Sequence, residues 1–279
     1  MMLDLPDFLP VVTPGLYIVA TPIGNRGDIT LRALSVLSKA DIICCEDTRT
    51  SLKLLQTFGI SKPLWAYHDH NGDKMRPKII EALGTGKIIA IISDAGMPLI
   101  SDPGYKLVRA CYENHLPVTT VPGASAVLAG LVLSAMPSDR FMFCGFANPK
   151  DFGNLKSIPA TLVFFEAPQR IIDCLEAMQA GFPDRDVAVV REITKRFEQV
   201  TFGSYSKVIT HYAAQESIKG EFVIVLSPPQ KQPAEAADID AALNRLMQEH
   251  SLKEASQLVA EAFGLPRKHV YQRALSLKN

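Results

Sequence analysis

The segment Ser93–Gly104 has the composition of a ligand-binding loop: it reads Ser-Asp-Ala-Gly-Met-Pro-Leu-Ile-Ser-Asp-Pro-Gly. It follows the apolar run Ile88–Ile92, which predicts a buried parallel strand, and precedes Tyr105–Glu113, whose apolar residues fit one helical face. Asp94 offers a carboxylate, and Gly96 lets the backbone approach a ligand where a Cβ atom would clash. Loops at the carboxyl ends of such strands bind ligands in open α/β sheets, although turn residues also suit a plain surface crossover.

Two further polar segments are able to do chemistry. Glu46-Asp47-Thr48-Arg49 carries two carboxylates and a guanidinium, which suit either a substrate- or base-bearing loop or a helix cap with a local ion pair. His68-Asp69-His70 could hold a metal with a third ligand from Asp47 or Asp94, or form a polar substrate loop. Because no second His/Cys cluster accompanies it, we expect no metal site.

Two helix-associated segments suggest binding of anions or nucleic acid. Pro122–Ala126 resembles a helix N-terminus able to receive a carboxylate or a phosphate. Gly264–Asn279 contains Arg267, Lys268, Arg273 and Lys278 and no acidic residue, with an aromatic Tyr271 among them. Such a basic helix fits contact with an RNA or DNA backbone, and a solvated terminal helix is the alternative.

The elements that must position these residues read as five βα units in succession. A parallel sheet with helices on both faces follows, and its polar loops should gather on one rim. The predicted strands are Leu16–Ala20, Asp41–Cys45, Leu64–Tyr67, Ile88–Ile92 and Val118–Val121. The sequence lacks GxGxxG after the first strand, GxxxxGK[ST] and GxSxG, which removes the common dinucleotide, NTPase and hydrolase motifs.

A second, mixed α/β region follows a stretch of Asn, Pro, Gly and Lys around residues 145–159. Its predicted strands are Thr161–Phe165, Val187–Val190, Gln199–Phe202 and Glu221–Leu226, with helices at Gln169–Gln179 and Ser204–Ala214. The predicted domains are an N-terminal α/β domain (1–144), a second α/β domain (145–228), a linker (229–237) and a helical tail (238–279). The tail contains three helical patterns, at Ile239–Glu249, Leu252–Phe263 and Arg267–Leu277.

The composition limits the classes of protein to which this chain can belong. The 279 residues are 47% hydrophobic and 21% charged with zero net charge, as in a globular protein that has no global field for nucleic acid or membrane. Five cysteines, an odd number without CxxC spacing, suggest reduced thiols and a cytoplasmic location. Met1–Pro10 has no basic region before a long apolar run, so we expect no signal peptide. Because no apolar stretch approaches the length needed to span a bilayer, we also expect no membrane span.

With these residues in view, the chain resembles the bacterial small-subunit ribosomal RNA ribose-2′-O-methyltransferase I family, a branch of the tetrapyrrole (corrin/porphyrin) methylase superfamily. The matching segments lie in the family's order across Leu16–Leu226, and together they are highly specific. They are Leu16–Asn25, Glu46–Arg49, His68–Asn71, Ser93–Gly96, Pro98–Gly104, Pro122-Gly123, Ser138–Phe141, Phe165–Pro168, Arg191–Lys195 and Lys219–Phe222. The C-terminal helices also look like the family's small tail domain.

The resemblance implies a two-domain tetrapyrrole-methylase-like α/β fold with S-adenosylmethionine in the cleft between domains. The implied reaction methylates the 2′-hydroxyl of a cytidine in the decoding region of 16S ribosomal RNA in the small ribosomal subunit, by a protein that is typically a homodimer. By analogy, the cofactor contacts would be Pro22, Asp94, Ala95, Gly96, Pro98, Leu99, Ile100, Ser125, Ala126, Phe165, Glu166, Gly220 and Glu221.

A ribose hydroxyl is a very weak acid, so the implied reaction calls for a general base, while methyl transfer from a sulfonium needs positioning and no metal. The candidates on the rim are Glu46, Asp47, His68 and Glu192. Substrate contacts are expected from Arg49, His70, Asn71, Arg170, Lys195, Arg267, Lys268 and Arg273. Two alternative functions remain open: a tetrapyrrole methyltransferase and a non-catalytic protein that binds RNA or the ribosome.

Three positions depart from the family's pattern. Met97 stands where the family usually has Thr, and Arg26 stands where Leu is usual. The segment after Phe146 is short and carries only Lys150 and Lys156, where relatives have a longer basic stretch. Because this segment is shorter and less basic, more of the expected RNA contact falls on Arg49, Arg170, Lys195 and the C-terminal helix.

Overall fold

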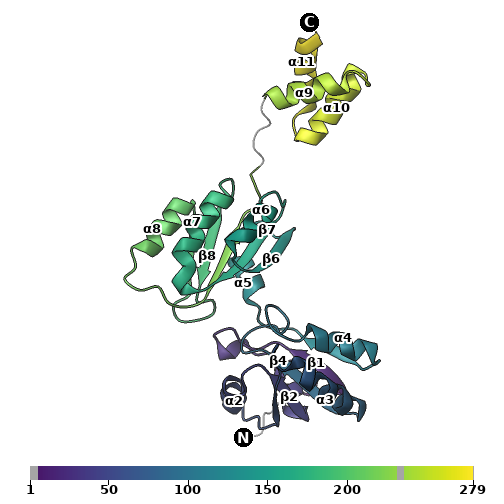
Figure 1. The fold of residues 1–279 in the computed structure, drawn as a ribbon, viewed down its shortest axis with the longest axis vertical. Helices are drawn as coiled ribbons and strands as arrows, with labels where there is room; N and C mark the ends of the chain where they lie inside the picture. The colour runs from purple at the N-terminus through teal and green to yellow at the C-terminus, as the bar shows by residue number, and fades with distance from the viewer. Residues whose placement is uncertain (1–5, 231–235, 279) are drawn as a thin grey trace. The chain divides into compact units, whose positions relative to one another are not determined.

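The computed structural model describes residues 6–230 and 236–278 (Figure 1). The pattern of contacts divides the chain into two compact units, residues 1–228 and residues 229–279. The first unit contains two five-stranded sheets. The predicted α/β class, with a parallel sheet, a mixed sheet and a helical C-terminal region, is confirmed.

The first sheet is entirely parallel, with strand order β3-β2-β4-β1-β5. Its strands are β1 (Gly15–Val19), β2 (Ile42–Cys45), β3 (Leu64–Ala66), β4 (Ile88–Ile92) and β5 (Val118–Val121). The crossover helices are α1 (Leu31–Lys39), α2 (Thr48–Thr57), α3 (Gly72–Gly84) and α4 (Tyr105–Glu113). Strand β4 is apolar throughout because both of its faces are covered: Ala90 and Ile92 join one core cluster, and Ile89 and Ile91 join another.

The second sheet is mixed, with strand order β6-β7-β10-β8-β9. Its strands are β6 (Phe141–Phe146), β7 (Thr161–Glu166), β8 (Val187–Arg191), β9 (Gln199–Gly203) and β10 (Phe222–Leu226). Only β6 and β7 pair in parallel, and the other three pairs are antiparallel. Helices α7 (Ile171–Gly181) and α8 (Tyr205–Ala213) pack on one face, and α5 (Ala126–Leu133) packs on the other. Short helical turns complete the unit: η1 (Arg26–Asp28), η2 (Pro149–Asp151), α6 (Phe152–Leu155) and η3 (Pro168–Arg170).

Strand β6 is an element that the sequence analysis did not identify. Its register against β7 shifts between Phe143 and Phe146, and Gly145 between them has a left-handed φ of 70°. This irregularity breaks the alternation that would have marked a strand. The strand also crosses the boundary predicted between residues 144 and 145, and α5, which precedes that boundary, packs on the second sheet.

The second unit is a three-helix domain made of α9 (Ala236–Leu246), α10 (Leu252–Phe263) and α11 (Arg267–Lys278). Leu243, Val259 and Val270, one from each helix, meet in its core. A capping box between Ser251 and Glu254 starts α10, and Gly264 ends it in the left-handed conformation. Residues 231–235 of the predicted linker lie outside the described residues, and α9 already begins at Ala236.

No helix in the described part of the chain combines the length and the apolar composition that crossing a membrane requires.

Candidate active site

A cavity of about 340 Å³ opens where the loops of the first sheet meet the second sheet. This volume lies within the range of roughly 300–1,000 Å³ that is typical of small-molecule sites. The lining comes from the loops after β1 and β4, the N-terminus of α5, and strands β6, β7 and β10 with the segment after β8. The lining residues are Ile23, Asp94, Ala95, Gly96, Met97, Ile100, Ser101, Asp102, Ser125, Ala126, Val127, Phe146, Phe165, Glu166, Ile193, Glu221, Phe222 and Val223.

Two of these loops are joined by a pair of backbone hydrogen bonds. Thr21, just after β1, donates its N–H to the Gly96 carbonyl oxygen at 2.9 Å, and Gly96 donates to the Thr21 carbonyl oxygen at 3.1 Å. The Thr21 hydroxyl also donates to the carbonyl oxygen of Ser93, at 3.2 Å. Both Thr21 and Ser93 are buried. The bridge therefore fixes the start of the Ser93–Gly104 loop against the loop that follows β1.

The rest of the Ser93–Gly104 loop folds back on itself through strained backbone. Leu99 and Ser101 both have left-handed φ angles, 73° and 64°, which non-glycine residues seldom adopt. The Leu99 side chain lies so close to Gly104 that a Cβ atom there would come within 2.7 Å of the Leu99 Cδ1 atom. The Leu99 side chain therefore packs against Gly104 at the end of the loop. Pro98 is buried, and Asp102 lines the cavity.

Asp102 is a cavity-lining carboxylate that the sequence analysis did not single out. Burial is the largest influence on its carboxyl group, followed by a hydrogen bond from Ser93 that acts in the opposite direction, and then by the charges of Glu46 and Asp94. The net result raises the pKa of Asp102 from 3.8 to about 6. The available signal was its position in the same loop as Asp94, because a fold-back of that loop brings both carboxylates to one site.

Glu166 is a buried carboxylate at the opposite wall, at the end of β7. It is 4% exposed, and its Oε1 atom accepts hydrogen bonds from the Ala167 N–H at 2.7 Å and from the Arg170 guanidinium at 2.7 and 2.9 Å. Arg170 remains more than half exposed while it makes this pair. Arg170, predicted to contact substrate, therefore also neutralises a residue that lines the cavity.

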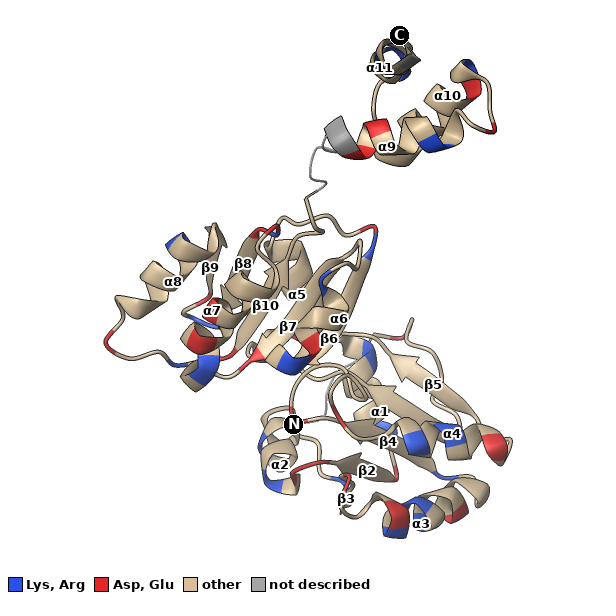
Figure 2. Cartoon of the chain, turned by 45° about the horizontal axis from the view of Figure 1, so that its top comes forward, with Lys and Arg blue, Asp and Glu red and all other residues tan. Residues whose placement is uncertain are grey.

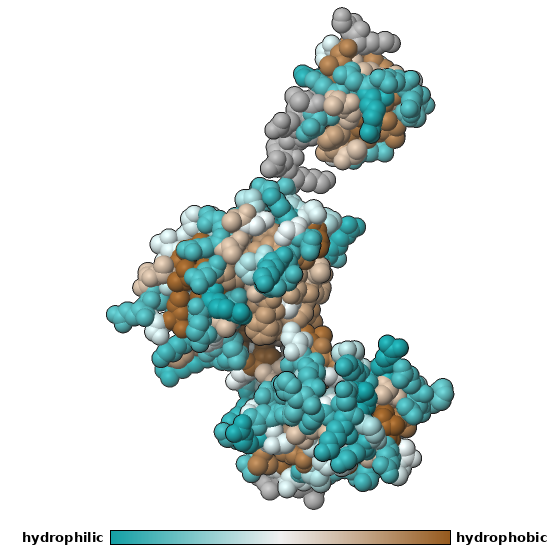
Figure 3. All heavy atoms as spheres, in the orientation of Figure 1, coloured by the Kyte–Doolittle hydropathy of each residue, from teal (hydrophilic) through white to brown (hydrophobic). Residues whose placement is uncertain are grey.

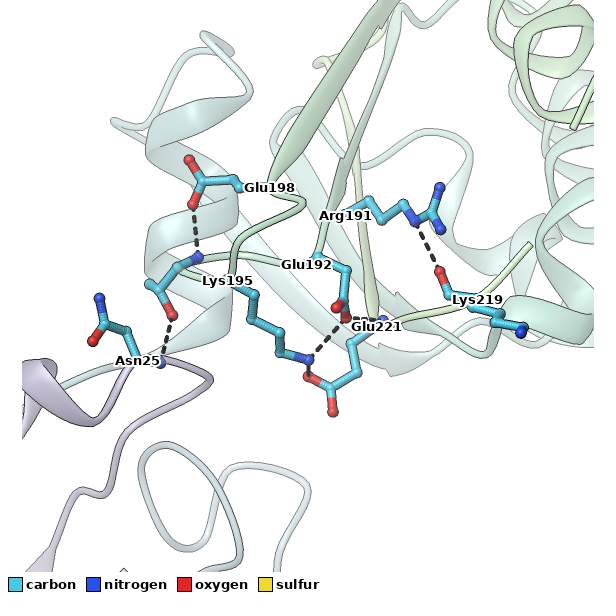
Figure 4. Close-up of polar contacts among 8 residues, drawn as sticks. Asn25, Arg191, Glu192, Lys195, Glu198, Lys219 and Glu221 are labelled. Carbon is cyan, nitrogen blue, oxygen red and sulfur yellow. Dashed lines mark hydrogen bonds and ion pairs between the residues drawn. The ribbon is translucent and has the colours of Figure 1, made fainter. Parts of the chain in front are cut away.

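Lys195 bridges two glutamates, Glu192 and the cavity-lining Glu221, and we call these three residues the lysine clamp (Figure 4). Lys195 Nζ donates to Glu192 Oε1 at 2.8 Å and to Glu221 Oε2 at 3.0 Å, and Glu192 Oε1 also accepts from the Glu221 N–H. Glu192 and Thr194 both have left-handed φ angles, and the Thr194 hydroxyl accepts from the Asn25 N–H at 3.1 Å. This segment therefore joins the second sheet to the loop after β1, close to the cavity.

The clamp also sets the ionisation of Glu192. Burial alone would raise the pKa of Glu192, but hydrogen bonds from Lys195 and the Glu221 N–H, with the charges of Lys195 and Arg191, hold it below its usual range. A carboxylate bound in this way is a poor proton acceptor.

The Glu46–Arg49 segment caps a helix. Asp47 Oδ1 accepts from the Arg49 N–H at 2.8 Å at the start of α2, and the two side chains form an exposed ion pair at 2.9 Å. Hydrogen bonding to Arg49 lowers the pKa of Asp47 to about 2. The Asp47 N–H in turn donates to Asp94 Oδ1 at 3.3 Å, so the segment supports a carboxylate that lines the cavity.

The His68–Asn71 segment forms a turn after β3. Asn71 uses its side chain inside that turn, accepting from the His68 N–H and donating to the Ala66 carbonyl oxygen. The rings of His68 and His70 lie edge to face, 6.0 Å apart. Within the described residues, no three His, Cys, Asp or Glu side chains come together as a metal site would require.

The structure brings many of the predicted cofactor-binding residues to the cavity wall. Those that line it are Asp94, Ala95, Gly96, Ile100, Ser125, Ala126, Phe165, Glu166 and Glu221, whereas Pro22, Pro98, Leu99 and Gly220 are not part of its lining. The predicted bases Glu46, Asp47, His68 and Glu192 do not line it either. Their assigned roles stay predictions.

In the second unit, the predicted nucleic-acid contacts divide into two kinds. Arg267 and Lys268 are exposed and are the first two residues of α11. Figure 2 shows Lys and Arg positions on α11 in blue. Arg273 instead forms a two-point ion pair with Asp240 of α9, with both N–O distances at 2.7 Å. The guanidinium of Arg273 therefore holds α11 against α9.

Comparison with known proteins places this architecture in a family. The family model of tetrapyrrole (corrin/porphyrin) methylases matches residues 15–209, and that of the RsmI C-terminal HTH domain matches residues 233–278. Uroporphyrin-III-C-methyltransferase from Thermus thermophilus superposes with a TM-score of 0.56 at 19% identity, covering 77% of this chain and 94% of that one. A diphthine synthase superposes with a TM-score of 0.60 at 14% identity, covering 76% and 89%. These two likenesses show the fold.

Closer relatives extend over nearly the whole chain. A protein of Mesorhizobium japonicum named ribosomal RNA small subunit methyltransferase I is 45% identical over 274 residues, which cover 95% of this chain and 93% of the relative. Its namesake from Erythrobacter litoralis is 46% identical over 273 residues, 96% of each chain. The chain therefore belongs to the tetrapyrrole (corrin/porphyrin) methylase family and, within it, to the ribosomal RNA small subunit methyltransferase I proteins.

Proposed function

We propose that this protein transfers a methyl group from S-adenosylmethionine to the ribose 2′-hydroxyl of a cytidine in the decoding region of 16S ribosomal RNA, within the small ribosomal subunit. The observation that carries the proposal is the 45–46% identity to proteins named ribosomal RNA small subunit methyltransferase I, which extends over both units. The methylase fold alone would fit several substrates, because related folds commonly serve different reactions.

The cavity has the chemistry that S-adenosylmethionine requires. Carboxylates of Asp94 and Glu221 suit its cationic groups and ribose hydroxyls, and Phe165 offers an aromatic edge or face to the adenine. Ser125 caps the N-terminus of α5, where backbone N–H groups favour a carboxylate. When bound there, S-adenosylmethionine would supply a methyl group made electrophilic by its sulfonium sulfur.

The second unit supplies the proposed contact with RNA. Arg267 and Lys268 are exposed on α11, and α10 and α11 are joined by the short turn at Gly264-Leu265-Pro266. Cationic side chains on a helix suit the phosphate backbone, whose neutralisation dominates affinity for nucleic acid. Ribosomal RNA as substrate implies the cytoplasm as the place of action.

We further propose a homodimer formed through the α5 face of the second sheet. Leu128 and Val132 on α5 are 53% and 77% exposed, and Phe141 and Phe146 of β6 are about half exposed. Figure 3 shows apolar residues on the second sheet, where Figure 1 places α5 and β6. An apolar face of this kind marks a protein contact.

Val132→Asp should halve the mass measured by light scattering, because it places a charge on this face. Val11→Asp, at an exposed position distant in sequence from α5 and β6, is the control and should leave the mass unchanged. A monomeric wild-type protein would contradict the dimer.

The test of the proposed function is methyl transfer from labelled S-adenosylmethionine to small ribosomal subunits that lack ribose methylation. Naked 16S ribosomal RNA and a tetrapyrrole precursor run in parallel. We expect label in subunit RNA, at a linkage that then resists alkaline cleavage. Label in the tetrapyrrole alone would overturn the proposal in favour of a small-molecule methyltransferase. Binding of the subunit without binding of S-adenosylmethionine would indicate a non-catalytic role.

A further inference from the structure

The proposed reaction, on which this inference rests, needs a proton acceptor beside the ribose hydroxyl. Two of the four residues predicted to be the general base already form ion pairs: Asp47 with Arg49, and Glu192 with Lys195. Glu46 and His68 do not line the cavity. The base must therefore be sought among the residues that do.

Asp102 is one of the carboxylates that line the cavity. It lies on the cavity wall, between Ser101 and the start of α4, and Met97, Ile100 and Ser101 from the same loop line the wall beside it. The left-handed backbone at Leu99 and Ser101 is what turns the loop back toward the cavity. Strained non-glycine residues of this kind persist where the surrounding structure enforces them, and they cluster at functional sites.

The other carboxylates of the cavity are held by protein groups. Glu166 accepts three hydrogen bonds from Ala167 and Arg170, and Glu221 accepts from Lys195. Asp94 accepts from the Asp47 N–H. Each of these three carboxylates is therefore already engaged by a protein donor. Asp102 has the Ser93 hydroxyl beside it and takes part in no ion pair among the described residues.

We infer that Asp102 is the general base of the proposed methyl transfer, its carboxylate taking the proton of the ribose 2′-hydroxyl. The new oxygen–methyl bond forms as the sulfur–methyl bond breaks, and the electron pair of that bond stays on sulfur. The hydroxyl proton goes to a carboxylate oxygen of Asp102, so one negative and one positive charge are neutralised together. No metal or further reactant is needed for this balance.

The surroundings of Asp102 set its expected pH dependence. The charged groups that act on it are Glu46, after β2, and Asp94, after β4, and the Ser93 hydroxyl opposes them. With burial, these raise the pKa of Asp102 to about 6, so the carboxylate is ionised at neutral pH and is a stronger base than an ordinary aspartate. The wild-type rate should therefore fall about tenfold per pH unit below about pH 6.

The experiment compares wild-type protein with Asp102→Asn and Asp102→Glu, and uses Asp173→Asn, an exposed acid on α7, as the matched control. Three quantities are measured on full-length protein: the single-turnover rate of methyl transfer to small subunits at saturating S-adenosylmethionine, its pH profile, and the Kd of S-adenosylmethionine by equilibrium dialysis. We expect Asp102→Asn to slow transfer by about 10²–10⁴-fold. Its Kd should stay close to wild type, and the acid limb of its pH profile should disappear.

Each outcome has a distinct meaning. A wild-type protein that labels the subunit and an Asp102→Asn variant that labels it equally fast would overturn the inference and leave the proposed function intact. A loss confined to the Kd would assign Asp102 to cofactor binding instead. No label from wild type would overturn the proposed function and, with it, this inference. If Asp102→Asn does not fold, a retained acid limb in Asp102→Glu, shifted along the pH axis, supports the assignment, and an unshifted limb contradicts it.

Discussion

Thr21 and Gly96 exchange both of their backbone hydrogen bonds, at 2.9 and 3.1 Å, and so join the loops that follow β1 and β4. The two strands are neighbours in the parallel sheet, and their loops would otherwise be separate crossovers. The bridge makes them one structural element, and Asp94 and Asp102 both line the cavity. The site is thus held in place by backbone before any ligand arrives.

This relationship predicts the effect of Gly96→Ala. Gly96 has a left-handed φ of 81°, and an added Cβ atom would lie 3.2 Å from Ile23 Cγ2 at the cavity wall. The strain should cost about 1–2 kcal/mol of unfolding free energy, or roughly 2–8 °C in Tm. S-Adenosylmethionine binding should also weaken, measured by equilibrium dialysis. Gly86→Ala is the control, since its φ is 82° and nothing lies within 4 Å. Equal binding by the two variants would show that the bridge does not shape the site.

Asp102 should reduce stability at neutral pH. Its pKa is raised from 3.8 to about 6, so the folded protein binds this proton more tightly than the unfolded chain does. The free energy of unfolding therefore falls as the pH rises between these values, and the penalty is complete above about pH 6. Asp102→Asn should raise Tm at pH 7.5 and lose most of that advantage near pH 4. A Tm at pH 7.5 below that of wild type would contradict the assigned environment.

The lysine clamp predicts the opposite sign of pH dependence. Lys195→Met leaves Glu192, which is 18% exposed, without its cation, and should cost roughly 1 kcal/mol. The pKa of Glu192 is lowered from 4.5 in the folded protein, so its contribution is present above that pH and is lost as the pH falls through the folded value. The Tm difference from wild type should be full at pH 7 and shrink below pH 4.5. Lys207→Met, at an exposed position of α8, is the control.

Much of this architecture could be predicted from the sequence because the local signals were strong. Strand β4 and helices α4 and α10 occupy the residues expected of them, since a continuous apolar run predicts the strand and a helical pattern of apolar residues predicts each helix. Strand β6 was missed because its bulge at Gly145 interrupts the alternation of side chains. Such a strand is specified by its pairing with β7, which is a tertiary contact.

The site was harder to predict, for a similar reason. Asp94 and Gly96 lie near the carboxyl end of a strand, and that position alone predicts a place on the rim. The position of Asp102 at the cavity wall depends on the left-handed backbone conformation of Leu99 and Ser101, which neither residue type favours. The ion pair of Arg49 with Asp47 agrees with the helix cap and local ion pair that its segment suggested, whereas the pairs of Arg170 with Glu166 and of Lys195 with Glu192 were not predicted.

Helix α11 predicts two different consequences of removing a positive charge. Arg267→Ala with Lys268→Ala should weaken binding to small subunits, and the slope of log affinity against log salt should fall by about 1 per lost phosphate contact. Arg273→Ala should mainly lower the thermal stability of the three-helix domain, because it breaks the pair with Asp240. Filter binding over a salt series and thermal melts separate the two. Lys87→Ala, at the amino end of β4, is the control, and a matching loss there would mean that general charge governs binding.

The measurement that tests the central claim most directly is nucleoside analysis of the methylated product. Small subunits lacking ribose methylation are incubated with the protein and S-adenosylmethionine, and the 16S ribosomal RNA is digested to nucleosides for mass spectrometry. The proposed function predicts one new 2′-O-methylcytidine, made by wild type and almost absent with Asp102→Asn. A methyl group found on a base, on another ribose, or not in the RNA at all would contradict it.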